Sequence, residues 1–173
     1  MRIGIDARWI FEEISGVGSY TWELIKHLAM VDRENEYVLF FDNDKVMRRT
    51  LRGIDPEYTE RFVAYRISNA IFSVASQVQL PGLFRKLDLD VFHSTNYMIP
   101  LMAFPKHRAG ATRCVVTIHD VIPLIFPDHA PKAKKRRFFP IYARLMKEVG
   151  ARADVIITPS ESSRKDVIER LSL

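Results

Sequence analysis

The stretch GIDARWIFEEISGVGSYTWELIKHLA, at residues 4–29, decides the fold. It begins with consecutive apolar residues, as a strand buried on both faces of a sheet does, and it ends with the spacing of an amphipathic helix. About nine irregular residues separate the strand from Gly16 and Gly18 at the entrance of the helix. Glycines in such a place let a backbone come close to another group, and the question is which group.

The same alternation of strand and helix continues along the rest of the chain. Runs rich in Val, Ile and Phe predict strands at 2–7, 37–42, 61–66, 89–94, 113–119 and 154–160. Because helical patterns separate these runs, the sequence predicts a doubly wound, mostly parallel α/β sheet of the Rossmann-like class. We find no internal repeat, low-complexity tract or Gly/Ser linker, so residues 1–173 are expected to form a single domain.

Helical patterns occupy the segments between these runs, and the last one follows the sixth run. Residues at steps of three and four mark the face of each helix that should cover the sheet. These residues are Val17, Tyr20, Leu24, Leu28 and Val31 in the first helix, Ile71, Val74 and Val78 in the second, and Phe138, Ile141, Tyr142, Leu145 and Val149 in the third. Ser160 is the expected N-cap of the last helix, which carries Val167, Ile168 and Leu171.

The composition is that of a water-soluble globular domain, with 47% hydrophobic and 27% charged residues. No segment has the roughly 20 apolar residues that a membrane-spanning helix needs. The chain begins directly with a strand pattern, so we expect a cytoplasmic protein without a secretory signal. The single cysteine, Cys114, lies in an apolar run and is predicted to be a buried structural thiol. The net charge of +5 favours an anionic partner.

Polar side chains follow the predicted strands. They are Asp6, Arg8, His93, Asn96, His119, Asp120 and Ser160. Open α/β sheets bind ligands beyond the carboxyl ends of their strands, so the sequence predicts a binding site at this edge. The imidazole of His119 could bond a sugar hydroxyl or act as an acid or base, or it could simply bond the nearby backbone. The histidines lack the spacing of metal ligands, so no metal site is expected.

The glycine loop does not fit a dinucleotide site. Such a site needs G-x-G-x-x-G directly after the first strand, whereas here Thr21 replaces the third glycine and the loop is long. This difference disfavours the binding of NAD or FAD at the loop. The backbone N–H groups of Gly16, Val17 and Gly18 at the start of a helix could still bind an anion such as a phosphate. The alternative is a flexible turn in which the glycines have positive φ angles.

Two further segments have open interpretations. The apolar loop at 97–104 either folds back on the core or forms a flap that faces lipid or the acceptor. The basic run KAKKRR at 132–137 is either a solvated face or, with Phe138 and Phe139, a patch for an anionic membrane surface. Its cations are Lys132, Lys134, Lys135, Arg136 and Arg137. No nucleic-acid-binding motif accompanies this charge, so no nucleic acid is expected as a partner.

Five segments together resemble a known family. GIDAR, SGVGSYTWELIKHL, DVFHSTNYMIPL, VVTIHDVIPLIFPD and ADVIITPSESSRKDVIERL occur in the order and spacing of the amino-terminal domain of retaining glycosyltransferases of group 1, family GT4. The chain is most similar to the mannosyltransferase-like branch that builds bacterial lipopolysaccharide and O-antigen chains.

The resemblance implies a GT-B enzyme, in which two Rossmann-like domains face each other across a cleft. The carboxyl-terminal domain of such enzymes holds most of the nucleotide-sugar and carries a paired-glutamate motif, which we do not find here. We therefore expect residues 1–173 to be the acceptor-side half, inactive in transfer by itself. The alternatives are a stand-alone Rossmann nucleotide-binding or oxidoreductase domain, and a non-catalytic module that docks on membranes.

The resemblance also implies roles for particular residues. The loop of Gly16, Val17 and Gly18 should approach the phosphates of the donor, and His119 should reach the hydroxyls of the donor sugar. We assign the acceptor side to Asp6, Arg8, Asn96, Tyr97 and Asp120. The implied donor is GDP-mannose or a UDP-sugar, and the implied acceptor is a glycan or a lipid-linked sugar at the inner face of the cytoplasmic membrane. No metal or other cofactor is expected.

Overall fold

The computed structural model of the chain describes residues 1–13, 15–126 and 135–173. In this part of the chain, six strands form one sheet with the order β3-β2-β1-β4-β5-β6, and all the neighbouring strands are parallel. The strands are β1 (Arg2–Asp6), β2 (Glu36–Phe41), β3 (Phe62–Arg66), β4 (Val91–Ser94), β5 (Arg113–Thr117) and β6 (Val155–Ile157). The predicted doubly wound, Rossmann-like sheet is confirmed.

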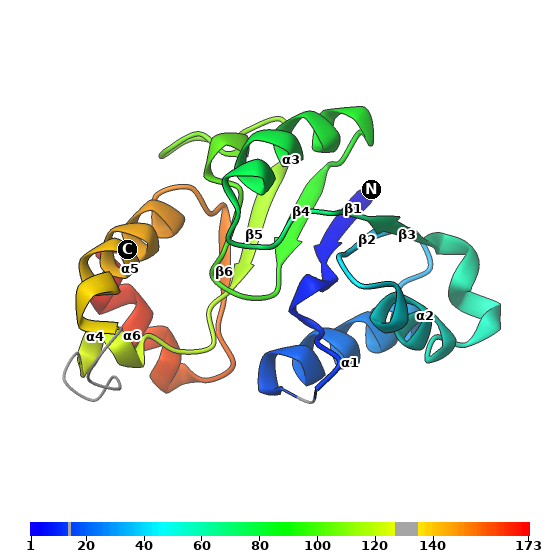
Figure 1. Cartoon of the computed structure of the whole chain (residues 1–173), viewed down its shortest axis with the longest axis horizontal. Helices are drawn as coiled ribbons and strands as arrows, with labels where there is room; N and C mark the ends of the chain where they lie inside the picture. The colour runs from blue at the N-terminus through cyan, green and yellow to red at the C-terminus, as the bar shows by residue number, and fades with distance from the viewer. Residues whose placement is uncertain (14, 127–134) are drawn as a thin grey trace.

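Helices lie on both sides of this sheet (Figure 1). They are α1 (Gly16–Val31), α2 (Asp44–Arg52), α3 (Val74–Lys86), α4 (Ile122–Ile125), α5 (Lys135–Gly150) and α6 (Glu161–Leu171). Short 3-10 turns are η1 (Ala7–Trp9), η2 (Pro56–Arg61) and η3 (Leu101–Ala103). The connections after β1, β2 and β4 start at the same edge of the sheet, because all the strands run in one direction.

The apolar residues form two cores, one for each set of helices. Ile25 of α1 and Val46 of α2 belong to one core, whereas α3, α5 and α6 supply the other. β2 serves both cores, since Val38 and Phe40 belong to one and Leu39 to the other. This explains why a strand that is buried on both faces is apolar at consecutive positions. Cys114 is buried in the larger core, as predicted.

The predicted faces of two helices were wrong. In α1 the buried residues are Gly18, Thr21, Ile25 and Ala29, whereas Val31 is 74% exposed. Three of these four residues are small or polar, so an apolar pattern misses the face that lies closest to the sheet. In α3 the buried residues are Ser76, Leu80 and Phe84, whereas Val74 and Val78 are exposed.

The other helices follow the prediction more closely. In α5 Val149 is fully buried, although Ile141 is exposed. Ser160 caps α6, because its Oγ accepts a hydrogen bond from the backbone N–H of Ser163 at 3.1 Å. Val167 and Leu171 of α6 are buried as expected. The helical faces named from the sequence do not include that of α2, which Asn43 caps.

Candidate functional site

The candidate site lies at the carboxyl edge of the sheet, between β1 and β4. β2 and β3 lie on one side of β1, and β5 and β6 lie on the opposite side of β4. Such a switch point leaves a crevice between the connections that leave the two central strands, and ligands of open α/β sheets bind there. The amino-terminal end of α1 and the residues after β4 and β5 lie at this edge.

The first turn of α1 presents unused backbone donors. Ser15 caps the helix, since its Oγ accepts a hydrogen bond from the N–H of Gly18 at 3.0 Å. The N–H groups of Gly16 and Val17 have no acceptor among the described residues. A Cβ at Gly16 would have open space around it. These donors, together with the positive end of the helix dipole, suit an anion.

The close approach that Gly18 allows is to the protein itself. A Cβ at Gly18 would lie 2.9 Å from the Oγ of Ser15 and 3.1 Å from the carbonyl oxygen of Trp9 in η1. The glycine therefore lets α1 lie directly against the segment that follows β1. No glycine in the described part of the chain has a positive φ angle, so the interpretation of this loop as a flexible positive-φ turn was wrong.

His119 follows β5 and is half-buried at the same edge. Its Nε2 lies 3.0 Å from the carbonyl oxygen of Thr95. A carbonyl oxygen can only accept, so we assign the proton of the neutral ring to Nε2, which leaves Nδ1 as an acceptor. No donor to Nδ1 is found among the described residues. The imidazole thus bonds the backbone, as one interpretation expected, and keeps a nitrogen for a ligand.

Tyr20 connects His119 to α1. The edge of one ring meets the face of the other, with centroids 4.8 Å apart and planes at 86°. The hydroxyl of Tyr20 lies 3.1 Å from the Oγ1 of Thr117, the last residue of β5. Because Tyr20 stands about one helical turn after Gly16, this contact brings His119 close to the free N–H groups of α1.

Thr95 makes hydrogen bonds with three parts of the sheet edge: α1, the end of β1 and the segment after β5. Its Oγ1 accepts a hydrogen bond from the Oγ1 of Thr21 at 2.8 Å and donates one to the carbonyl oxygen of Asp6 at 3.2 Å. Its own carbonyl oxygen accepts the bond from His119. Thr95 and Thr21 are fully buried. The position of the imidazole is therefore tied to α1 and to β1.

His93 lies beneath this layer. Its Nε2 is 2.9 Å from the Oγ1 of Thr117, which Tyr20 also contacts. Burial lowers the pKa of His93 to about 4. The ring is therefore neutral at physiological pH, and its contacts make it a support for Thr117.

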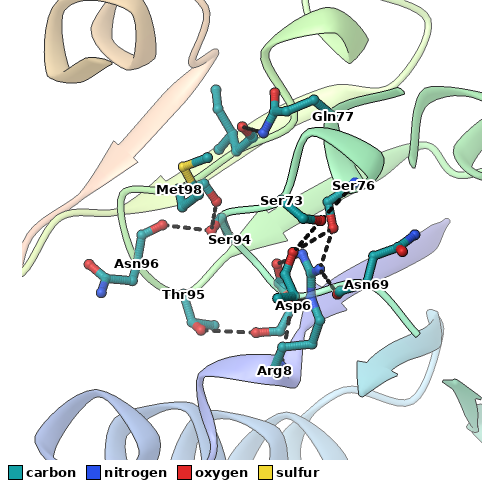
Figure 2. A network of polar contacts seen from close by, with 12 residues as sticks. Asp6, Arg8, Asn69, Ser73, Ser76, Gln77, Ser94, Thr95, Asn96 and Met98 are labelled. Carbon is teal, nitrogen blue, oxygen red and sulfur yellow. Dashed lines mark hydrogen bonds and ion pairs between the residues drawn. The ribbon is translucent and has the colours of Figure 1, made fainter. Parts of the chain in front are cut away.

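Asp6 and Arg8 form a buried ion pair at the end of β1 (Figure 2). The carboxylate accepts hydrogen bonds from Nε and Nη2 of Arg8, both at 2.7 Å. Nη1 of Arg8 donates to the carbonyl oxygen of Asn69 at 3.1 Å and to the Oγ of Ser76 at 3.0 Å. The exposed fractions are 0% for Asp6 and 2% for Arg8. The pair thus joins β1 to α3, and its assignment to the acceptor side stays a prediction.

A family comparison covers most of the chain that carries these contacts. The model of Glycosyltransferase Family 4 matches residues 14–173. The chain belongs to this family. Its function is accordingly of the glycosyltransferase type. A comparison with curated proteins finds no match.

The remaining residues of this family 4 domain that we assigned to the acceptor side, Asn96 and Asp120, lie at the same edge. Asn96 is half-buried, and its Oδ1 accepts a hydrogen bond from the N–H of Tyr97. In Figure 2 its side chain points away from the ion pair of Asp6 and Arg8. Asp120 is exposed, and its Oδ1 accepts a bond from the N–H of Ile122 at the start of α4. Contact of these residues with an acceptor remains a prediction.

Sequence reasoning missed an aromatic cluster around Tyr97. Its ring lies 6.0 Å from that of Trp9, 6.4 Å from that of Phe72 and 5.6 Å from that of Tyr142. Phe72 is 60% exposed. The signal in the sequence was weak, because Trp9 lies just after the first strand, in η1, but its partners come from distant segments. The carboxyl edge of the sheet thus carries a cluster of aromatic rings beside its polar groups.

The apolar loop after Tyr97 mostly folds back on the core. Ile99 and Phe104 are buried in the larger core, whereas Met102 is 70% exposed. Of the basic run, Lys132 and Lys134 lie outside the described residues. Lys135, Arg136 and Arg137 fall in α5, but their side chains are not among those described. Within the described part, no group of three or more His, Cys, Asp or Glu residues could hold a metal ion.

Proposed function

We propose that this family 4 glycosyltransferase transfers a mannose-like sugar from a nucleotide-sugar, GDP-mannose or a UDP-sugar, to a glycan or lipid-linked acceptor. The pathway we propose is the synthesis of bacterial cell-surface polysaccharide, and the configuration of the anomeric carbon is retained. One observation supports the proposal above the others. Within the described part of the chain, Nδ1 of His119 has no donor, and the first N–H groups of the neighbouring helix α1 have no acceptor. Tyr20 of this helix contacts the imidazole.

The two groups suit the two parts of a nucleotide-sugar. The N–H groups of Gly16 and Val17 would bind the diphosphate, which gains negative charge as the bond to the sugar breaks. Nδ1 of His119 would accept a hydrogen bond from a hydroxyl of the donor sugar. Both groups are fixed before the reaction, so they can stabilise the transition state without reorganisation.

The transfer itself needs no protein nucleophile. The bond between the anomeric carbon and the diphosphate oxygen breaks, and the acceptor hydroxyl forms the new bond from the same face. The proton of that hydroxyl passes to the departing diphosphate. The role of this edge is then to position the reactants and to stabilise the charge that develops on the leaving group.

We also propose that the enzyme works at the inner face of the cytoplasmic membrane, where its basic run at 132–137 meets anionic lipid. Each basic residue near such a surface contributes about 1 kcal/mol to binding. No helix in the described part of the chain has the length and apolar character needed to cross a bilayer.

Replacing His119 with alanine in the active enzyme tests the proposed role of the imidazole. We expect kcat/KM for sugar transfer to fall about 100-fold, the loss typical of one transition-state hydrogen bond. His27→Ala is the matched control, because His27 is exposed on α1 and, among the described residues, bonds Glu23 of its own helix. It should change kcat/KM by less than about twofold. NMR of the product would report the anomeric configuration.

A structural role for His119 would give another pattern. His119→Ala would then melt several degrees lower while kcat/KM stayed unchanged. Such a result would remove the imidazole from the proposed donor site.

A further inference from the structure

The exposed face of α2 carries a stripe of cations. These cations are Lys45, Arg48, Arg49 and Arg52. Lys45 stands three and four residues before the two middle arginines, and Arg52 stands four and three residues after them, so all four share one side of the helix. They line a hollow of about 330 Å³. The opposite side of the helix buries Val46 and Thr50 against the protein. We call this stripe the α2 basic face.

Few acidic groups balance this charge. The ammonium of Lys45 lies 3.7 Å from the carboxylate of Glu12. The guanidinium of Arg49 donates to the backbone carbonyl oxygens of Phe11 and Glu12. Arg48 and Arg52 have no hydrogen-bond acceptor or acidic partner within the described part of the chain. Among the described residues, Glu12 is therefore the one carboxylate that pairs with these four cations.

The pKa of Glu12 is consistent with a strongly positive surrounding. A hydrogen bond from Asn43 lowers this pKa most, and the charge of Lys45 lowers it further. Two further acids are already paired: Asp44, the first residue of α2, lies 3.0 Å from Arg66, and Glu23 of α1 bonds Lys26. They leave the charge of Arg48 and Arg52 uncompensated.

The stability of the helix does not explain this arrangement. Cations near the last turn, such as Arg49 and Arg52, interact favourably with the helix dipole. Lys45 lies in the first turn of α2, where the dipole disfavours a cation. Like charges at steps of three and four also weaken a helix. A cluster that costs stability in this way points to an anionic partner.

The geometry of the α2 basic face indicates which anion would fit. Guanidinium groups match phosphate oxygens with two parallel hydrogen bonds. From Lys45 to Arg52 the stripe extends about 10 Å along the helix axis, which is longer than one phosphate. The apolar side chains of α2, Val46, Met47 and Leu51, all pack against the smaller core, so none is available for insertion into lipid.

We propose that the α2 basic face binds a soluble ligand that carries two or more adjacent phosphate groups. This site is separate from the first turn of α1 and from His119, and it does not rest on the proposed sugar transfer. Phosphate chemistry could also come from lipid headgroups, and the experiment distinguishes the two sources.

The test is a calorimetric titration of the protein with inorganic tripolyphosphate. No nucleotide is added, because a nucleoside diphosphate would itself fit the α2 basic face, and the α2 variant distinguishes this face from an anion site at α1. The variant carries Arg48→Gln and Arg52→Gln. The matched control carries Lys165→Gln and Arg170→Gln on α6, which removes the same net charge at the other end of the sheet (Figure 1).

We expect the unmodified protein and the control to bind tripolyphosphate, and the double α2 variant to bind it at least tenfold more weakly. Orthophosphate should bind more weakly than tripolyphosphate, and added salt should weaken both. Equal weakening in the variant and the control would overturn the proposal, because only net charge would then matter. Binding to vesicles of anionic phospholipid with no binding of tripolyphosphate would also overturn it.

A second measurement covers the case in which the double variant does not fold. Amide NMR shifts of the unmodified protein can be followed as tripolyphosphate is added. The proposal requires the largest changes at 44–53. Changes confined to 16–21 would place the anion at α1 and contradict the α2 site, whereas loss of the proposed sugar transfer would leave these shifts unaffected.

Discussion

His93 shows how a buried side chain makes the stability of this domain depend on pH. Its pKa falls from 6.5 in an unfolded chain to about 4 in the fold, because burial disfavours the charged ring. Between these two pH values the unfolded chain binds more protons than the folded one, so the free energy of unfolding rises with pH. The contribution is complete above pH 6.5 and is lost as the pH falls toward 4.

We therefore expect the free energy of unfolding to drop by about 3 kcal/mol from this one group between pH 7 and pH 4. Urea denaturation of the unmodified protein and of His93→Gln at several pH values measures it. Carboxylates titrate in both proteins, so the difference between the two curves isolates His93. Parallel curves for the two proteins would show that the ring is not held neutral by burial.

Single residues also show what the sequence could predict. His119 could be placed at the sheet edge because it ends an apolar run that had to be a strand. Its contacts with Tyr20 and Thr95 could not be predicted, since they depend on how α1 packs against the ends of β4 and β5. The burial of Arg8 was equally hidden, because arginine is rarely buried and one of its acceptors, Ser76, lies far along the chain.

At the scale of single elements, helix α1 has two glycines in its first turn, and their surroundings differ. Gly18→Ala should destabilise the protein by about 1–3 kcal/mol, because the new Cβ would lie too close to Ser15 and to the backbone of Trp9. Gly16→Ala is the matched control. Its Cβ meets nothing within 4 Å, so alanine should leave stability unchanged or raise it by up to about 1 kcal/mol.

Thermal or urea denaturation of both variants tests this pair. Equal effects of the two substitutions would contradict the close packing of α1 on η1. The same packing explains why the predicted face of α1 was wrong. Small residues let a helix approach a sheet closely, and a search for large apolar residues cannot detect them.

At the scale of the whole molecule, the doubly wound parallel sheet could be predicted from the sequence because strand and helix patterns alternate along the chain. The α2 basic face could not be predicted, since its cations come together only when the helix forms. The basic run at 132–137 was visible in the sequence, and its role at a membrane remains to be tested.

We expect the protein to sediment with vesicles that contain anionic lipid and to be released as salt rises, because salt screens surface charge. Replacing Lys132, Lys134, Lys135, Arg136 and Arg137 with serine should abolish this binding without unfolding the protein. The variant with Arg48→Gln and Arg52→Gln serves as the control for charge at another place. Equal recovery with neutral and anionic vesicles would leave the run as an ordinary solvated face.

The proposed ligand of the sheet edge is a nucleotide-sugar, and a binding titration of the active enzyme tests this most directly. GDP-mannose, UDP-glucose and NADH are titrated in parallel. We predict that a nucleotide-sugar binds, that His119→Ala weakens this binding, and that NADH does not bind at the same concentrations. Binding of NADH with no binding of either nucleotide-sugar would contradict the proposal that the sheet edge binds a nucleotide-sugar.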